Sequence, residues 1–305
     1  MRWSLIGLGV CAALLWQMSA FAGEESDEGG WNPPSAGPVT TWTAPLVGKG
    51  KFAVQPSAIY AHMHGSFNDD GHSDSLTNGE KVRKSLFQEQ ISFQYGITDE
   101  WEIDAQTVYQ ETRVTDEGAK AHANGIGDSY LFTRYELFEE KGWIPEATGL
   151  LQVKIPTGKY QHANADKLGA DIMGTGSWDP GVGINLTKKL KPFIVHADAI
   201  MSFPQAVRID GTKTQYGNYL NYDAAVEYFL PKGFNLMLEA NALYQGNAKL
   251  DSEKDPASDM RSLTLSPGIG WSNDRIQTLV AYQRTVSGRN TDANDSIVAT
   301  FVYTF

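Results

Sequence analysis

Apolar and polar residues alternate along most of the chain from residue 51 onward. At the C-terminus, SIVATFVYTF, one face of an extended chain carries Ile297, Phe301 and Tyr303, and the other carries Ser296 and Thr300. Period two is the repeat of a β-strand whose two faces meet different surroundings. Each such stretch is about 10 residues long, with aromatic residues near the ends of its apolar face. This length and pattern are typical of a tilted membrane-spanning strand.

Twelve segments of the chain have this alternation. Residues 101–110 and 233–244 repeat the pattern of the C-terminus. The expected strands are 52–63, 85–97, 101–113, 126–138, 145–156, 177–187, 192–203, 219–231, 234–246, 260–272, 275–286 and 295–305.

The connections between these strands alternate in length. The short ones are 98–100, 139–143, 188–191, 231–233 and 273–274. The long polar ones are 64–84, 114–125, 157–176, 204–218, 247–259 and 287–294. An outer-membrane barrel has this alternation, because its short turns lie on the periplasmic side and its long loops outside. The pattern therefore predicts an all-β fold, a transmembrane antiparallel up-and-down β-barrel of about twelve strands with both termini on the periplasmic side.

The first 22 residues have the pattern of a secretory signal peptide. Arg2 supplies a positive charge, residues 5–16 are an apolar run, and Ala20-Phe21-Ala22 forms a cleavage site. We expect cleavage after Ala22 and export of the mature chain.

The residues that follow the cleavage site differ from the rest of the chain. Residues 23–50 are first acidic and then rich in glycine and proline, and their prolines oppose a regular strand or helix. The chain is thus divided into a signal peptide (1–22), an N-terminal tail or plug (23–50) and a barrel (51–305). The sequence does not decide whether the tail fills the lumen.

Composition narrows the functional classes. The mean hydropathy is −0.34, and no apolar run of 18 residues follows the signal peptide, which excludes a polytopic helical membrane protein. The net charge of −11 argues against a nucleic-acid partner. The single cysteine, Cys11, lies in the signal peptide, so disulfides, thiol-ligated metals and thiol catalysis are excluded from the mature protein. We expect no cofactor and no metal.

The chain ends on an aromatic residue, Phe305. Bacterial outer-membrane barrels commonly end in such a strand, which the barrel assembly machinery reads. Together with the signal peptide and the loop pattern, Phe305 predicts the bacterial outer membrane as the location. The expected partners are outer-membrane lipid and lipopolysaccharide, the assembly machinery and a small-molecule solute.

One stretch, residues 125–160, carries a recognisable motif: a G-x-G-D strand, a basic–aromatic pair, a short turn and a strand ending in K-x-P-T-G. It resembles the outer-membrane proteins of the MetA-pathway of phenol degradation family, and residues 48–56 resemble that family's first strand. The resemblance implies a monomeric, transporter-like barrel that passes hydrophobic or aromatic compounds. The matching residues are Gly125, Gly127, Asp128, Arg134, Tyr135, Lys154, Pro156, Thr157 and Gly158.

If the apolar face of each strand meets lipid, the opposite face lines the lumen. By this parity, ten acids but only two bases point inward. Three interpretations stay open: a solvated lumen whose charges cross-link strands, a path for cations or neutral solutes, or a specific binding site. A barrel of about twelve strands has a lumen intermediate in width between that of an eight-stranded barrel, which side chains fill, and that of an open sixteen-stranded porin. A narrow or occluded pore is therefore expected. The predicted lumen-lining residues are Glu102, Asp104, Asp128, Arg134, Glu136, Glu146, Lys154, Asp179, His196, Asp198, Asp223, Glu227, Glu239 and Asn241.

The sequence predicts an outer-membrane channel or transporter for small molecules, hydrophobic or aromatic ones among them, rather than an enzyme. One alternative is a structural or adhesive barrel that conducts nothing. The other is a barrel hydrolase, for which His196 and Asp198, two residues apart on one face, would form a His–Asp dyad. No nucleophile for such a site is evident.

Two geometric predictions test the phase of the strands. Around residues 231–233, a three-residue turn pairs Tyr228 with Leu236 and Asp223 with Asn241, with Gly233 in the left-handed region. A second prediction places Arg261 and Arg284 on the outward face near the long loops, where lipopolysaccharide phosphates could pair with them. If the numbers of paired residues added to an odd sum, or if either arginine lay at mid-depth in the membrane, the assignment of inward and outward residues would be wrong.

Overall fold

A computed structural model describes residues 31–75, 83–116 and 118–305. The expected signal peptide (1–22) and residues 23–30 of the expected tail lie outside the described residues. Among the residues that the structure describes, no helix is both long enough and apolar enough to span a membrane.

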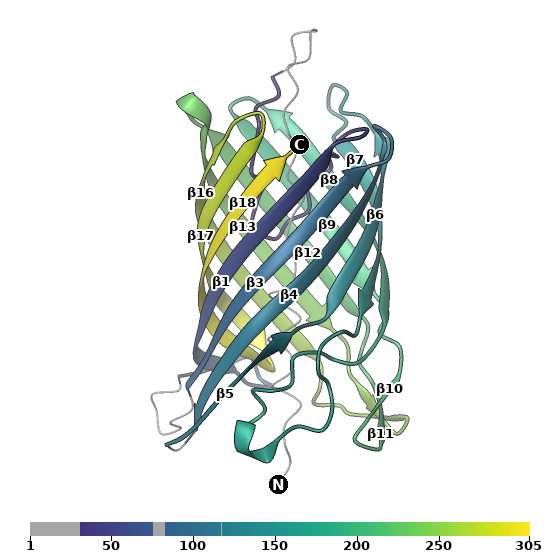
Figure 1. Cartoon of the computed structure of the whole chain (residues 1–305), viewed down its shortest axis with the longest axis vertical. Helices are drawn as coiled ribbons and strands as arrows, with labels where there is room; N and C mark the ends of the chain where they lie inside the picture. Colours follow the sequence, from purple (N-terminus) through teal and green to yellow (C-terminus); the bar gives the residue numbers. More distant parts are fainter. Residues whose placement is uncertain (1–30, 76–82, 117) are drawn as a thin grey trace.

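Twelve antiparallel strands of the described chain close into a barrel (Figure 1). Sequential strands pair with one another, and the last pairs with the first, so no strand of the ring has a free long edge. The strands are β1 (Phe52–Phe67), β3 (Arg83–Gly96), β4 (Trp101–Asp116), β6 (Ser129–Phe138), β7 (Glu146–Ile155), β8 (Asp179–Leu190), β9 (Phe193–Ser202), β12 (Tyr219–Phe229), β13 (Phe234–Gln245), β16 (Met260–Ser272), β17 (Ile276–Arg289) and β18 (Thr291–Thr304). The predicted fold class, the number of strands and their order are confirmed.

Most long connections carry short extra strands at one end of the barrel, which we call the long-loop end (Figure 1). β5 continues the pairing of β4, and β10, β11, β14 and β15 form a separate small sheet. The opposite end, with the tight turns, is the short-turn end. The extra elements are β2 (Ser73–Ser75), β5 (Ala119–Ile126), β10 (Val207–Ile209), β11 (Thr212–Gln215), β14 (Lys249–Leu250), β15 (Glu253–Lys254), and the 3-10 turns η2 (Ala165–Lys167) and η3 (Pro231–Gly233).

One predicted loop is wrong. Residues 287–294 were expected to form a long polar loop, but β17 ends at Arg289 and β18 begins at Thr291, so Asn290 alone connects them. Asn290 has φ 50°, in the left-handed region that asparagine tolerates better than most residues. The polar composition of these residues reflects strands that extend past the apolar band, because pairing of the backbone does not depend on an apolar face.

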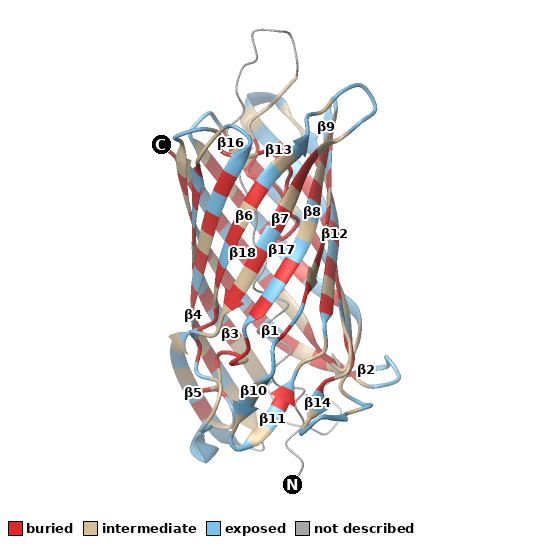
Figure 2. Cartoon of the chain, turned by 90° about the vertical axis from the view of Figure 1, so that its right-hand side faces the viewer, coloured by how far each residue is buried: buried red, intermediate tan, exposed pale blue. Residues whose placement is uncertain are grey.

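Burial alternates along the strands of the wall (Figure 2). The buried positions are mostly polar and the exposed ones mostly apolar, the reverse of a soluble protein. On β4, Trp101 and Ile103 are exposed, whereas Glu102 and Asp104 are buried. Outward apolar and inward polar positions are the arrangement of a membrane barrel, whose outer surface meets lipid. Large aromatic side chains such as Tyr135 are exposed near the ends of the wall.

The hairpin of β12 and β13 has the predicted register. Tyr228 lies opposite Leu236 and Asp223 opposite Asn241, and the Leu230 N–H donates to the Phe234 carbonyl at 2.8 Å. Gly233 has φ 80°, as predicted. The neighbouring Lys232 also has a positive φ, which the sequence did not indicate.

Both arginines are exposed on the outward face, but they lie at different depths. Arg261 stands next to the first residue of β16, and its guanidinium lies 5.2 Å from the centre of the Tyr244 ring. Arg284 is deeper on its strand than expected, because β17 continues to Arg289, and its guanidinium lies 3.5 Å from Asp295. Pairing with lipopolysaccharide stays a prediction.

Candidate functional site: the lumen and the N-terminal segment

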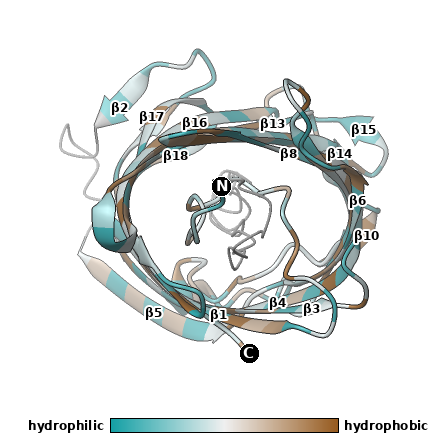
Figure 3. Ribbon diagram, turned by 90° about the horizontal axis from the view of Figure 1, so that it is seen from above, coloured by the Kyte–Doolittle hydropathy of each residue, from teal (hydrophilic) through white to brown (hydrophobic). Residues whose placement is uncertain are grey.

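We call residues 31–50 the N-terminal segment. Its middle part, residues 35–47, lies inside the ring of strands (Figure 3), and its two ends lie at the short-turn end. None of the named strands or helices falls within the segment, as expected from its prolines. Ser35 bonds to Glu227 and Val47 to Glu102, both near the short-turn end, while residues 39–42 bond to acids at mid-strand. The segment is therefore U-shaped, with its apex halfway along the barrel.

Glu239 holds the apex. Its carboxylate accepts the backbone N–H groups of Val39 at 2.6 Å, Thr40 at 2.8 Å and Thr41 at 2.6 Å. The hydroxyls of both threonines and the Asn241 amide donate to the same group. Hydrogen bonds to an ionised acceptor are stronger than neutral ones, so this one side chain fixes three consecutive residues.

Two further acids bind the arm of the segment that returns from the apex to the short-turn end. Asp198 accepts the Trp42 backbone N–H at 2.7 Å, and Glu102 accepts that of Val47 at 2.7 Å. All of these groups are at most 5% exposed. A buried backbone N–H needs an acceptor, and here the barrel wall supplies it through carboxylates.

Arg134 joins the wall to the same arm. Its guanidinium donates to Glu102 Oε1 at 2.6 Å and to the Thr43 carbonyl. The Thr148 hydroxyl donates to the next carbonyl, that of Ala44, at 2.6 Å. The period-two pattern predicts that Arg134 and Glu102 both face the lumen. The register of β4 with β6 sets them opposite one another. A fully buried ion pair that also binds a loop backbone positions that loop tightly.

His196 contacts two residues that also hold the N-terminal segment, because Thr187 accepts the Ala44 N–H and Glu227 accepts the Ser35 hydroxyl. The His–Asp dyad considered from the sequence does not form, and His196 bonds to these two residues instead. Its Nδ1 lies 2.9 Å from the Thr187 hydroxyl and its Nε2 lies 2.9 Å from Glu227. Side chains two residues apart on a strand start about 7 Å apart and run parallel, so His196 reaches across to the neighbouring strands instead. Asp198 is engaged with Trp42.

A second cluster lies at the long-loop end and explains the family motif physically. Lys154 Nζ lies 2.7 Å from Asp179 and 3.5 Å from Asp128. Asp128 also accepts the backbone N–H groups of Gly158 at 3.1 Å and Thr175 at 3.0 Å. The motif acid and lysine thus fold the β7–β8 loop back against the barrel.

The motif glycine is required by the close packing of that loop. A Cβ on Gly158 would lie 2.7 Å from the Met173 carbonyl oxygen and 2.8 Å from the Gly174 nitrogen. Farther out, the Lys159 ammonium pairs with Asp171. Partial burial raises the pKa of Asp171, but its hydrogen bonds from Lys159 and the Asn164 N–H outweigh that effect and hold the pKa below its ordinary value.

The remaining sequence-predicted residues fall into two groups. Asp104 is buried beside Glu102, and Asp223, which accepts the Ala242 N–H at 3.1 Å, lies in register with both Asp198 and Asn241. Glu136 and Glu146 are only partly buried near the short-turn end, and Glu146 lies 3.9 Å from Lys189.

The sequence did not indicate Ser35, Thr148 or Thr187 as site residues. The two tryptophans of the proline-rich tail, Trp31 and Trp42, were the one available signal, because a solvated tail seldom carries large aromatic residues.

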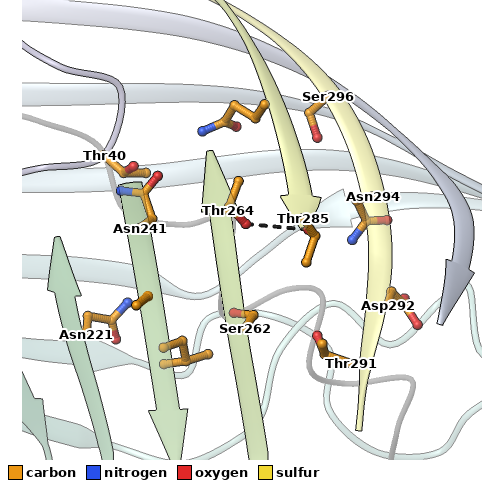
Figure 4. Close-up of a pocket in the computed structure, with 13 residues that line it drawn as sticks. Thr40, Asn221, Asn241, Ser262, Thr264, Thr285, Thr291, Asp292, Asn294 and Ser296 are labelled. Carbon is orange, nitrogen blue, oxygen red and sulfur yellow. Dashed lines mark hydrogen bonds between the residues drawn. The ribbon is translucent and has the colours of Figure 1, made fainter. Parts of the chain in front are cut away.

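A small polar cavity of about 40 Å³, partly open to solvent, lies on the long-loop side of Thr40 (Figure 4). Most of its lining residues are uncharged amides and hydroxyls, such as Asn221, Asn241 and Thr285, and the others are Ala242, Leu243 and Asp292. The described residues contain no group of three or more histidines, cysteines or acids arranged to hold a metal ion.

The family model described as "Putative MetA-pathway of phenol degradation" matches residues 64–301. The chain belongs to this family. The matched range includes the motif of residues 125–160, whereas residues 48–56 precede it. In this phenol-degradation family member, the motif residues Asp128, Lys154 and Gly158 are the ones that hold the β7–β8 loop.

Solved structures share the fold of this family member. The COG4313 outer membrane channel from Pseudomonas putida F1 is 13% identical, with a TM-score of 0.70 over 86% of this chain and 98% of that one. The NanC porin (9% identical, TM-score 0.49, 82% and 98% covered) and the CymD monoaromatic hydrocarbon channel (10% identical, TM-score 0.42, 84% and 88% covered) are more distant. The first likeness shows the fold of an outer-membrane channel.

Proposed function

We propose that this protein is an outer-membrane channel for small molecules, hydrophobic or aromatic compounds among them, and that the N-terminal segment is a plug that closes its lumen. The family and the barrel fold support the channel. The observation that carries the plug is the bonding of three consecutive N–H groups of the segment to Glu239. Hydrogen bonds to charged groups contribute about 1.5–3 kcal/mol each, so the closed state is stable without being covalent.

The location and partners belong to the same proposal. A signal peptide cleaved after Ala22 would direct the chain to the outer membrane, where it would act as a monomer among lipid and lipopolysaccharide. Phe305, whose ring lies 4.6 Å from that of Tyr303 and 5.9 Å from that of Phe52, would serve the assembly machinery as its terminal signal.

The alternatives have less support. A hydrolase would need a nucleophile that a substrate can reach. The hydroxyl beside His196, that of Thr187, is fully buried and accepts the Ala44 backbone N–H at 2.9 Å. No feature of the described residues favours a purely adhesive barrel over a channel. Conductance in a planar bilayer separates the channel from an adhesive barrel, and lipase and protease assays of the refolded barrel test the hydrolase.

The test is the single-channel conductance of Glu239→Gln in a planar bilayer. The amide nitrogen that replaces one carboxylate oxygen turns a donor toward the N–H groups of the apex, so the plug is released and conductance rises several-fold. Glu136→Gln is the matched control, because the structure gives Glu136 no hydrogen bond to the segment; it should conduct as the wild type does. Equal conductance in both variants contradicts the plug.

A further inference from the structure

Some inward positions of the wall are apolar, although the lumen face of such barrels is ordinarily polar. Tyr219 and Met260, the first residues of β12 and β16, lie at the long-loop end, and Phe132 lies deeper on β6. These side chains form one cluster of contacting buried residues that reaches the plug. Its members are Trp42, Val108, Tyr130, Phe132, Leu150, Ile200, Tyr219, Leu243 and Met260.

Within this cluster, Trp42 lies between an aromatic ring and a cation. Its ring centre is 4.8 Å from that of Phe132 at an angle of 54°, and the Arg134 guanidinium carbon lies 5.1 Å from the indole. Tyr130 stacks on Phe132 at 5.8 Å and 8°. Aromatic pairs and cation–π contacts recognise the faces of flat π-systems, beyond what burial of area contributes.

The polar atom of the indole takes no part in this recognition. Trp42 Nε1 is buried and has no hydrogen-bond acceptor among the described residues, whereas the backbone N–H of Trp42 donates to Asp198. A buried unpaired donor costs free energy. A ring without a strong donor therefore suits this position better than the indole that occupies it.

We propose that Phe132, Tyr130 and Arg134 form a binding site for a flat aromatic ring that lacks a strong hydrogen-bond donor, and that Trp42 occupies this site as an internal competitor. The inference rests on the proposed channel function and names its solute class. Because Trp42 follows the apex held by Glu239, a solute ring and the seated plug exclude one another. A ligand that binds only the state with the plug displaced shifts the population toward that state.

The test is binding of naphthalene to the purified full chain in detergent, measured by equilibrium dialysis. If the indole fills the site at least nine-tenths of the time, its removal raises the apparent affinity at least about tenfold. We expect this gain in Trp42→Ala and its loss in Trp42→Ala/Phe132→Ala. Trp31→Ala, which removes the same side chain from the same segment, should bind naphthalene as the wild type does. Circular dichroism verifies the strand content of each variant.

Decalin, a saturated fused ring of similar size, distinguishes a ring site from a merely apolar cavity. The proposal is overturned if Trp42→Ala binds naphthalene no tighter than the wild type, if Phe132→Ala leaves the gain intact, or if decalin gains affinity equally. Binding is measured without flux, so a gain for naphthalene in a barrel that never conducts would support the ring site and contradict the channel.

Discussion

Glu239 accepts three backbone N–H groups, and Arg134 donates to both Glu102 and the N-terminal segment. The alternation of apolar and polar residues along each strand predicts that these side chains face the lumen, because this alternation can be recognised within a single strand. Their partners could not be foreseen. Val39 is 200 residues from Glu239 in sequence, and a proline-rich segment has no periodicity from which to assign a contact.

At this scale, Arg134→Met tests the buried ion pair. It leaves the Glu102 carboxylate buried without its cationic partner, although the Val47 N–H still donates to it, and removing one partner of such a pair costs about 3–5 kcal/mol. The free energy of unfolding, from urea titration in lipid vesicles, should fall by that amount. Arg261→Gln on the outer surface should change it by less than about 1 kcal/mol. Equal small changes in both variants would rule out the role given to Arg134.

The strands were predictable because each one carries its own alternation, and register followed from turn length and parity, as in β12–β13. The connection at 287–294 was mistaken because polar composition alone does not separate a loop from a strand that extends beyond the membrane. The β7–β8 loop folds inward because of its contacts with Asp128 and Lys154. The alternation along the strands does not predict contacts between strand residues and a loop, so this feature could not be foreseen.

For the β7–β8 loop, Gly158→Ala should displace the loop without opening the barrel. The added Cβ would lie 2.7 Å from the Met173 backbone oxygen, which cannot move as a flexible side chain would. We expect trypsin to cleave faster after Lys159 and Lys167, and mass spectrometry measures the rate of this cleavage. In Gly149→Ala the nearest atom would be 3.5 Å away, on the Leu137 side chain, and cleavage should match the wild type. Unchanged cleavage in Gly158→Ala would contradict the packing of the loop.

Across the whole molecule, acids outnumber bases by 36 to 25, and the inward face shares that excess. Arg134 and Lys154 are both paired with carboxylates, while Asp198 and Asp223 face one another across adjacent strands. A narrow lumen in a low-dielectric wall focuses the field of such charges.

The conducting barrel should therefore prefer K⁺ over Cl⁻, and the preference should fall as salt rises and screening shortens. Asp223→Asn with Glu227→Gln should reduce the preference more than Glu136→Gln, because Glu136 is only partly buried near the short-turn end. The reversal potential under a KCl gradient measures this. A preference for Cl⁻ in the wild type would reject the lumen assignment.

The central claim, a channel closed by its own N-terminal segment, is tested most directly by the single-channel conductance of a chain lacking residues 31–47, compared with the full chain in the same bilayer. The deletion removes the donors seated on Glu239, Asp198 and Glu102 and leaves the twelve-stranded wall intact. The account predicts a conductance several-fold larger and stable in time. A deleted barrel that folds, inserts and conducts no more than the full chain would contradict it.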